Sequence, residues 1–185
     1  SDVQVIVYQR GIDSWEYTGL YHTTNSSGEF SFSVPGAGEY TLEFNDLSYA
    51  HFIEYYDEKR TLAEATPIPV TIGEQIVITT TLDLAGSISG VVTSALSPHL
   101  PIPNVNVFAW RLEADAWQLA GQVVTKNEGD YGIPRLRNGE YRLQFIPDSL
   151  SQYSMRYYPD SPSLEMATSL TISSSNPLTG IDVQL

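Results

Sequence analysis

The chain contains few residues of the types that usually carry out chemistry. It has no cysteine and only three histidines, His22, His51 and His99. None of the histidines has a second metal ligand at a suitable spacing, and none lies beside a nucleophile motif. The sequence also lacks Gly-x-Ser-x-Gly, phosphate-cradling and dinucleotide-binding motifs. We therefore expect no catalytic residue, no metal site and no cofactor, and we expect that the protein is not an enzyme.

Acidic residues are numerous, but their spacing does not favour catalysis. A pair such as Glu54 and Asp57 could serve a glycosidase only in a cleft that raises the pKa of one member. Glu128 and Asp130 flank a turn glycine and could contribute to a calcium site, but Ca²⁺ takes about 6–8 oxygen ligands. The matching turn at residues 25–29 offers too few such ligands. Solvated carboxylates are the favoured interpretation in both cases.

Aromatic residues are the strongest candidates for a binding site. Tyr8 and Trp15 in the first half of the chain match Trp110 and Trp117 in the second half. In a strand that turns every second residue to the core, Phe108 and Trp110 would face outward. Exposed rings stack on sugars or anchor interfaces, whereas a packed Trp buries a large apolar surface. We favour packing, and we keep Trp15, Trp110, Trp117, Tyr8 and Phe108 as candidate ligand-binding residues.

A repeated sequence pattern positions these residues. Residues 127–145 read NEGDYGIPRLRNGEYRLQF, and residues 26–44 read SSGEFSFSVPGAGEYTLEF. Each stretch has a turn, an extended run, a second turn and a strand in which Tyr, Leu and Phe alternate with polar residues, so each half is predicted to contain a β-hairpin. Further matches join residues 2–8 with 104–110, 55–56 with 157–158, and 79–84 with 180–185.

The repeat predicts two domains, residues 1–85 and residues 86–185, each the size of a small β-sandwich. The second copy starts without a linker, which favours a stiff junction. Its leading strand, residues 88–93, has no counterpart in the first copy, so we expect the first domain to have an open sheet edge that attracts another strand. A boundary within a longer tandem array is the preferred explanation. The alternative is that another chain or an upstream segment supplies the strand.

Two smaller elements are expected in the first copy. Residues 76–84 are predicted to form its closing strand, because apolar and β-branched residues dominate there. Residues 61–64, TLAE, fit a capping box and predict at most two helical turns.

The net charge of −13, from 9 basic and 22 acidic residues, limits the partners. Such a field repels nucleic acid phosphates and anionic lipid surfaces. No apolar run approaches the roughly 20 residues of a membrane span. We expect neither a nucleic acid partner nor a membrane span. The sequence has no starting Met and no signal peptide, which is typical of a mature piece of a longer protein.

The second copy also carries a family resemblance. Its segments ISGVVT, PIPNVNVFAW, GDYGIPRLRNGEYRLQF and TGIDVQL resemble the carboxypeptidase regulatory-like domain, a small β-sandwich of the transthyretin (prealbumin) type. The chain is also similar, more distantly, to the collagen-adhesin B-type repeats of bacterial surface proteins. The resemblance implies an all-β fold of two tandem transthyretin-like (Greek-key) β-sandwiches, the first lacking its leading strand.

The resemblance implies a function as well. Members of these families act as spacers, stabilising modules, adhesin stalks and accessory domains of secreted enzymes. For this chain it implies a non-enzymatic structural or adhesion module of a larger secreted or cell-surface bacterial protein, partnered by neighbouring repeats and by a protein or polysaccharide ligand. The alternative is a carbohydrate-binding accessory module that uses exposed aromatics. Adhesin-type relatives often carry a Lys–Asn isopeptide bond, but Lys59 and Lys126 lie at polar loop and turn positions, so we expect none.

Overall fold

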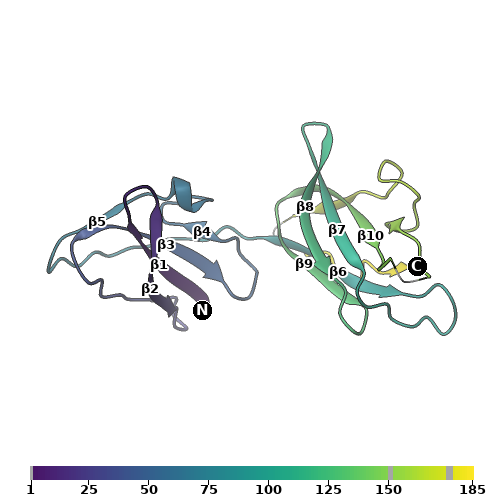
Figure 1. The fold of residues 1–185 in the computed structure, drawn as a ribbon, viewed down its shortest axis with the longest axis horizontal. Helices are drawn as coiled ribbons and strands as arrows, with labels where there is room; N and C mark the ends of the chain where they lie inside the picture. The colour runs from purple at the N-terminus through teal and green to yellow at the C-terminus, as the bar shows by residue number, and fades with distance from the viewer. Residues whose placement is uncertain (1, 150–151, 174–176) are drawn as a thin grey trace. The chain divides into compact units, whose positions relative to one another are not determined.

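The computed structural model describes residues 2–149, 152–173 and 177–185, which form β-strands and loops in three sheets. Among these residues there is no α-helix, and the all-β class predicted from the sequence is confirmed. The chain divides into two compact units, unit 1 (Ser1–Leu84) and unit 2 (Ala85–Leu185), drawn in Figure 1. No helix with the length and hydropathy of a membrane span occurs in the described ranges.

Unit 1 is built on one five-stranded antiparallel sheet. Its order is β2–β1–β3–β4, and β5 pairs with the opposite end of β3. Alternate residues of the two central strands face one side, so that Val5, Val7, Tyr40, Leu42 and Phe44 form a buried core. The strands are β1 (Val3–Arg10), β2 (Trp15–Thr23), β3 (Gly38–Asp46), β4 (Glu54–Tyr55) and β5 (Ile68–Val70).

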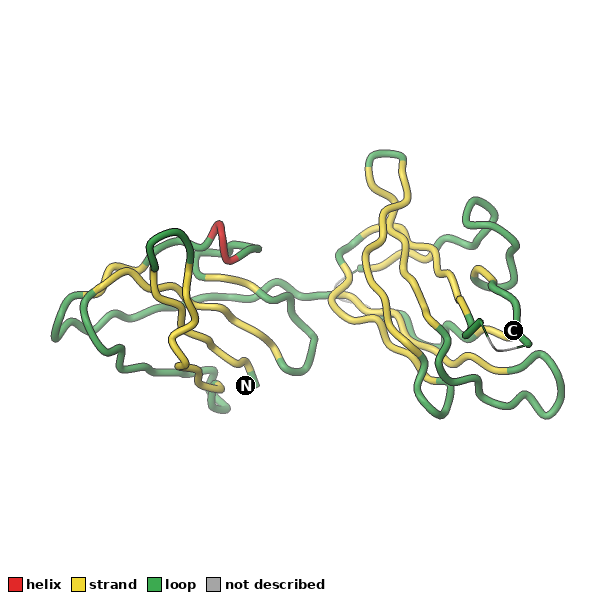
Figure 2. The backbone as a smooth tube through the Cα atoms, in the orientation of Figure 1, coloured by secondary structure: helices red, strands yellow, loops and turns green. Residues whose placement is uncertain are grey.

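Two segments of unit 1 that were predicted as strands belong to no sheet. Residues 29–37 and 71–83 run as loops in Figure 2, so the hairpin predicted over 26–44 contributes only β3 and the closing strand predicted at 76–84 is wrong. A strand requires a hydrogen-bonded neighbour, and the described part of unit 1 has no strand beside these segments. Five of their side chains nevertheless pack on the core: Phe30, Phe32, Val34, Ile78 and Leu82.

The helical turn predicted at residues 61–64 is present in a short form. A 3₁₀ turn, η1, spans Leu62–Glu64, and the hydroxyl of Thr61 donates to Oε2 of Glu64 at 2.8 Å. The Thr61 hydroxyl makes no capping bond to the backbone, so the turn is held by a side-chain pair rather than by a full capping box.

Unit 2 has two sheets. The larger has the order β11–β10–β7–β8, with β12 also paired to β10, and the smaller has the order β13–β6–β9. β6 is central in the smaller sheet, antiparallel to β9 and parallel to β13. The strands are β6 (Gly86–Thr93), β7 (Asn106–Glu113), β8 (Ala116–Val124), β9 (Asp130–Leu136), β10 (Gly139–Ile146), β11 (Arg156–Tyr157), β12 (Leu170–Ile172) and β13 (Val183–Gln184).

Both sheets of unit 2 contribute to one core. Ile88 of β6 and Ile133 of β9, from the smaller sheet, lie in one buried cluster with Val107 of β7 and Phe145 of β10. The ring of Tyr131 meets that of Phe145 edge-on, with centroids 5.7 Å apart. The smaller sheet therefore closes the core that the larger sheet leaves open on one side.

The two units repeat the same tyrosine contact. In unit 1 the hydroxyl of Tyr40 donates to the carbonyl of Gly36 at 3.0 Å, and in unit 2 the hydroxyl of Tyr141 donates to the carbonyl of Arg137 at 2.8 Å. Both tyrosines begin the Tyr-x-Leu-x-Phe strand of the repeat, and both bond four residues back across the preceding turn. The repeated sequence thus produces a repeated structure at this corner.

The first turn of the repeated stretch is also the same in both units. The N–H of Gly28 donates to the carbonyl of Asn25, and that of Gly129 donates to Lys126, each at 2.9 Å. Both glycines have positive φ, +80° and +72°, a conformation that costs other residues free energy. Gly28 and Gly129 therefore serve the same role in the two units, which is to let the backbone take the positive φ that this turn requires.

Candidate functional site

The sequence-predicted aromatic residues of unit 2 lie on the outer side of its larger sheet. Along β7, Val107 and Ala109 are buried, so Phe108 and Trp110 face away from the core and are half-buried. The strand register places Phe108 beside Gln144 and Trp110 beside Arg142. We call this surface the outer aromatic face, and its residues are Phe108, Trp110, Trp117, Arg142, Gln144 and Tyr157.

A buried amide fixes one half of the outer aromatic face. The indole N–H of Trp110 donates to Oε1 of Gln144 at 3.1 Å, and Nε2 of Gln144 donates to the hydroxyl of Tyr157 at 3.0 Å. Nε2 of Gln144 also lies 3.1 Å from the sulfur of Met155. The side chain of Gln144 is thus bonded at both ends, and its bonds hold Trp110 and Tyr157 in place.

An arginine covers the other half. The guanidinium carbon of Arg142 lies 4.5 Å from the centroid of the Trp117 ring, a cation–π contact worth about 1–2 kcal/mol. Nη1 of Arg142 donates to the carbonyl of Leu164 at 2.6 Å. Trp117 is half-buried under this contact, so only part of its ring is available for stacking. Sequence reasoning missed Arg142 and Gln144, because each acts through a residue of a different strand.

The other two candidates, Tyr8 and Trp15, belong to unit 1. The hydroxyl of Tyr8 donates to Oε2 of Glu43 at 2.9 Å, and burial together with this bond raises the pKa of Tyr8. Trp15 is only 8% exposed, with the guanidinium of Arg10 5.0 Å from its ring centroid. A ring this covered offers little area to a ligand. Within the described residues its indole N–H has no hydrogen-bond partner.

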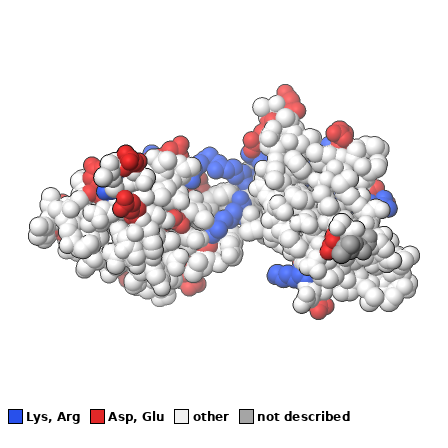
Figure 3. Space-filling view, viewed as in Figure 1, with Lys and Arg blue, Asp and Glu red and all other residues white. Residues whose placement is uncertain are grey.

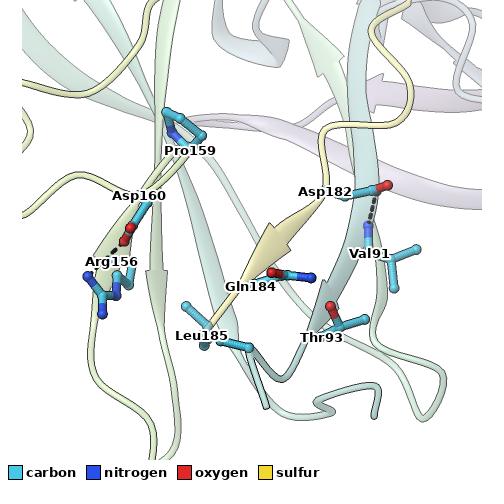
Figure 4. Close-up of a pocket in the computed structure, with 9 residues that line it drawn as sticks. Val91, Thr93, Arg156, Pro159, Asp160, Asp182, Gln184 and Leu185 are labelled. Carbon is cyan, nitrogen blue, oxygen red and sulfur yellow. Dashed lines mark hydrogen bonds and ion pairs between the residues drawn. The ribbon is translucent and has the colours of Figure 1, made fainter. Parts of the chain in front are cut away.

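Unit 2 has a cavity of about 550 Å³, shown in Figure 4. All three of its charged side chains already have partners: Arg156 contacts Asp160 at 2.7 Å, and Oδ1 of Asp182 accepts from the N–H of Val91 at 2.9 Å. Figure 4 shows Asp160 and Asp182 on opposite sides of the cavity, so they do not converge on one point. Its lining comes from β6, β13 and the β11 turn, which are far apart in sequence, and no sequence signal indicated it.

The carboxylates do not form a metal centre in the part of the chain that the structure describes. No group of three or more His, Asp or Glu residues there could hold a metal ion. On the face drawn in Figure 3, the acidic side chains lie at separate places on each unit. At the turn considered for calcium, Oε2 of Glu29 accepts from the side-chain amide of Asn25 at 2.8 Å. The interpretation of this turn as a solvated one stays a prediction.

Unit 1 has a groove of about 620 Å³ between residues 30–36 and 71–78, with Val7, Tyr40 and Leu42 of the core at its floor. We call it the open groove. Two apolar side chains that line it are highly exposed, Ile72 at 89% and Val77 at 84%. The sequence predicted an open sheet edge in this unit, but it did not indicate which residues would surround a groove.

Comparison with known proteins assigns no family. No family model matches the chain, and no curated protein matches it. One solved structure with similarity is the C-terminal fragment of the pilus adhesin SpaC from Lactobacillus rhamnosus GG, at 11% identity, covering 92% of this chain and 78% of that chain. The TM-score is 0.26, which is too low to support a shared fold or a shared function. The family resemblance seen in the sequence stays a prediction.

Proposed function

We propose that the chain is a pair of repeated β-sandwich modules of the transthyretin type, the first without its leading strand. The modules serve as a non-enzymatic structural or adhesion part of a larger secreted or cell-surface bacterial protein. The observation that carries the proposal is that the same hydrogen bond occurs within each unit, made by Tyr40 in unit 1 and by Tyr141 in unit 2. A chain that repeats one compact module is typical of spacers and stalks, in which each module contacts its neighbours.

The internal organisation of the units supports a spacer. Each unit has a hydrophobic core of its own, and Leu84 of unit 1 is followed directly by Ala85 of unit 2. Modules joined without a Gly/Ser linker transmit force between neighbours better than modules on a flexible tether. Neighbouring repeats of the same protein are the partners that this arrangement favours.

Single-molecule pulling on the full chain tests the proposal. Two separate unfolding events are expected, with length gains of roughly 30 and 35 nm at about 3.5 Å per residue for the two units. One event that releases the whole chain would show that the units are not independent modules. Antibody labelling of intact, unpermeabilised cells of the source organism tests the location, and labelling only after permeabilisation would contradict it.

A second candidate function is carbohydrate binding at the outer aromatic face. It is favoured by the half-exposed rings of Phe108, Trp110 and Trp117 on one side of one sheet. A glycan array with the full chain tests it, with Trp110→Ala and Trp117→Ala as variants and Trp15→Ala in unit 1 as the matched control. Glycan binding that only the unit 2 variants abolish would support this candidate, and no binding by the wild type would exclude the glycans tested.

A further inference from the structure

Two strands of unit 2 that are far apart in sequence, β6 and β13, run side by side in the same direction. Val92 of β6 lies opposite Val183 of β13 in a parallel pairing. A separate parallel bridge between Ile88 and Leu178 extends the pairing toward the start of β6. Because the strands are parallel, the start of β6 and the end of β13 lie at opposite ends of the paired region.

Backbone hydrogen bonds join the two segments at both ends of this pairing. At one end, the N–H of Leu178 donates to the carbonyl of Ser87 at 2.9 Å. At the other end, the N–H of Leu185 donates to the carbonyl of Thr93 at 2.9 Å, and the N–H of Ala95 donates to the carbonyl of Leu185 at 2.8 Å. We call this paired region the β6–β13 ladder, and it comprises residues 87–95 and 178–185.

Side chains tie the centre of the β6–β13 ladder. Oδ1 of Asp182 accepts from the backbone N–H of Val91 at 2.9 Å, as Figure 4 shows. The hydroxyl of Tyr131, on the neighbouring strand β9, donates to the carbonyl of Ile181 at 2.6 Å. A Cβ at Gly90 would lie 2.1 Å from the same carbonyl oxygen, so the glycine allows the two backbones to approach closely. A carboxylate and a tyrosine from a third strand therefore reinforce the backbone bonds.

The direction of a pulling force decides how these bonds are loaded. A force on residues 84 and 184 acts at opposite ends of the ladder and draws β6 and β13 past each other, so the bonds that join the strands carry the load together. A force on residues 96 and 184 acts at one end and peels the strands apart, so the bonds break one after another. The first direction therefore requires several hydrogen bonds to break in the same step.

We propose that the β6–β13 ladder is a mechanical clamp, which makes unit 2 resist tension along the chain. The inference deepens the proposed function and rests on it, because a module within a larger protein passes tension between its neighbours. The load on the side of unit 1 reaches the ladder directly, since Leu84 of unit 1 is followed by Ala85 and then by β6. The clamp gives the spacer a property that its repeated fold alone does not supply.

Unfolding of the full chain under constant force, in two pulling directions, tests the clamp. The chain has no cysteine, so introduced cysteines place the handles. Leu84→Cys with Gln184→Cys loads the ladder along its strands, and Leu96→Cys with Gln184→Cys peels it from one end; the three side chains are exposed. At the same force, unfolding along the strands is expected to be slower by about tenfold or more, because more than one hydrogen bond must break in one step.

Two buried tyrosines provide matched variants for the same measurement. The hydroxyl of Tyr131 bonds to the ladder at Ile181, whereas the hydroxyl of Tyr141 bonds to the carbonyl of Arg137 across a turn. With force along the strands, Tyr131→Phe is expected to raise the unfolding rate about fivefold, the factor for one ordinary hydrogen bond, and Tyr141→Phe is expected to change it less than about twofold. In urea, without force, the two substitutions are expected to lower the stability of unit 2 to a similar extent.

Two results would overturn the proposal. Equal unfolding rates in the two pulling directions would show that the ladder does not carry the load. Equal effects of Tyr131→Phe and Tyr141→Phe on the rate under force would place the resistance elsewhere in unit 2. Both handles lie at the borders of unit 2, so either failure leaves the proposed function standing, whereas a single unfolding event over the whole chain would contradict the proposed function itself.

Discussion

The hydroxyl of Tyr8 donates to the carboxylate of Glu43 at 2.9 Å, in the place where unit 2 joins the indole N–H of Trp110 to Gln144 at 3.1 Å. In each unit an aromatic residue of the first hairpin strand bonds across to the central strand, β3 or β10. The partners differ in chemistry: unit 1 uses a buried acid, and unit 2 uses an amide. The geometry of the module is therefore kept while the charge of its outer face changes.

The first prediction concerns this bond. Glu43→Gln is expected to change the free energy of unfolding by less than about 1 kcal/mol, because the amide oxygen still accepts from Tyr8, whereas Glu43→Leu leaves that hydroxyl without its acceptor and is expected to cost about 1–3 kcal/mol. Urea unfolding of the full chain, with hydrogen exchange to assign the effect to unit 1, measures both. In a double-mutant cycle with Tyr8→Phe, a coupling energy near zero between Tyr8 and Glu43 would contradict the prediction.

The second prediction contrasts two buried threonines. Thr41 is fully buried in β3, and its hydroxyl has no hydrogen-bond partner in the described structure, so Thr41→Val is expected to stabilise unit 1 by about 1 kcal/mol. Thr125 in unit 2 is the control, because its hydroxyl donates to the carbonyl of Ile102 at 2.8 Å and accepts from the N–H of Val105 at 2.9 Å. Thr125→Val is expected to destabilise by about 1–3 kcal/mol. Thermal unfolding of both variants measures these changes. A loss of stability in Thr41→Val would contradict the prediction.

The third prediction concerns the acid sensitivity of unit 1. Burial alone would raise the pKa of Asp46, but hydrogen bonds from His51 and from the hydroxyl and N–H of Ser48 outweigh it and lower the pKa to about 2 from 3.8. A carboxyl group with a lowered folded-state pKa stabilises the fold above its unfolded pKa, and that stability is lost as the pH falls through the folded value. Unit 1 is therefore expected to lose roughly 2 kcal/mol between pH 4 and pH 2.

Asp46→Asn measures this contribution directly. At pH 7 the variant is expected to be less stable than the wild type by roughly 2 kcal/mol, and the difference is expected to shrink toward pH 2, where the wild-type carboxyl group is also neutral. Glu39→Gln, at an exposed position of the same strand, serves as the control and is expected to change little. A difference between Asp46→Asn and the wild type that stays constant from pH 7 to pH 2 would rule out the assigned role.

The fourth prediction compares the two turn glycines. Gly28→Ala places a side chain at positive φ but in open space, so it is expected to cost about 1–2 kcal/mol of backbone strain. Gly129→Ala adds a steric clash, because its Cβ would lie 2.4 Å from the carbonyl oxygen of Val92 in β6, and it is expected to cost at least about 2 kcal/mol more than Gly28→Ala. Urea unfolding resolved by unit measures the difference. Equal losses of unfolding free energy in the two variants would show that Val92 of β6 does not lie as close to the Gly129 turn as the structure indicates.

The sequence by itself determined the strands that carry their own pattern. In β3 and β10, Tyr, Leu and Phe alternate with polar residues, and the alternation places one face of each strand in a core whatever the neighbouring strand is. The turns at Gly28 and Gly129 could also be predicted from the sequence, because positive φ is a local requirement of the backbone. These features depend on residues near one another in the chain, which is why a single sequence was enough to find them.

Only the tertiary structure decided the features that depend on a partner. Residues 30–34 carry the same alternation as a strand, yet they form none, because a β-strand exists only when a second segment pairs with it. The same applies to the matching tryptophans: Trp15 is 8% exposed, whereas its counterpart Trp117 is half-buried, and the difference lies in what other segments place over each ring. Strand pairing and the burial of a ring both depend on residues that are distant in sequence. Only the folded chain brings such residues together, or leaves a groove where a pairing segment is absent.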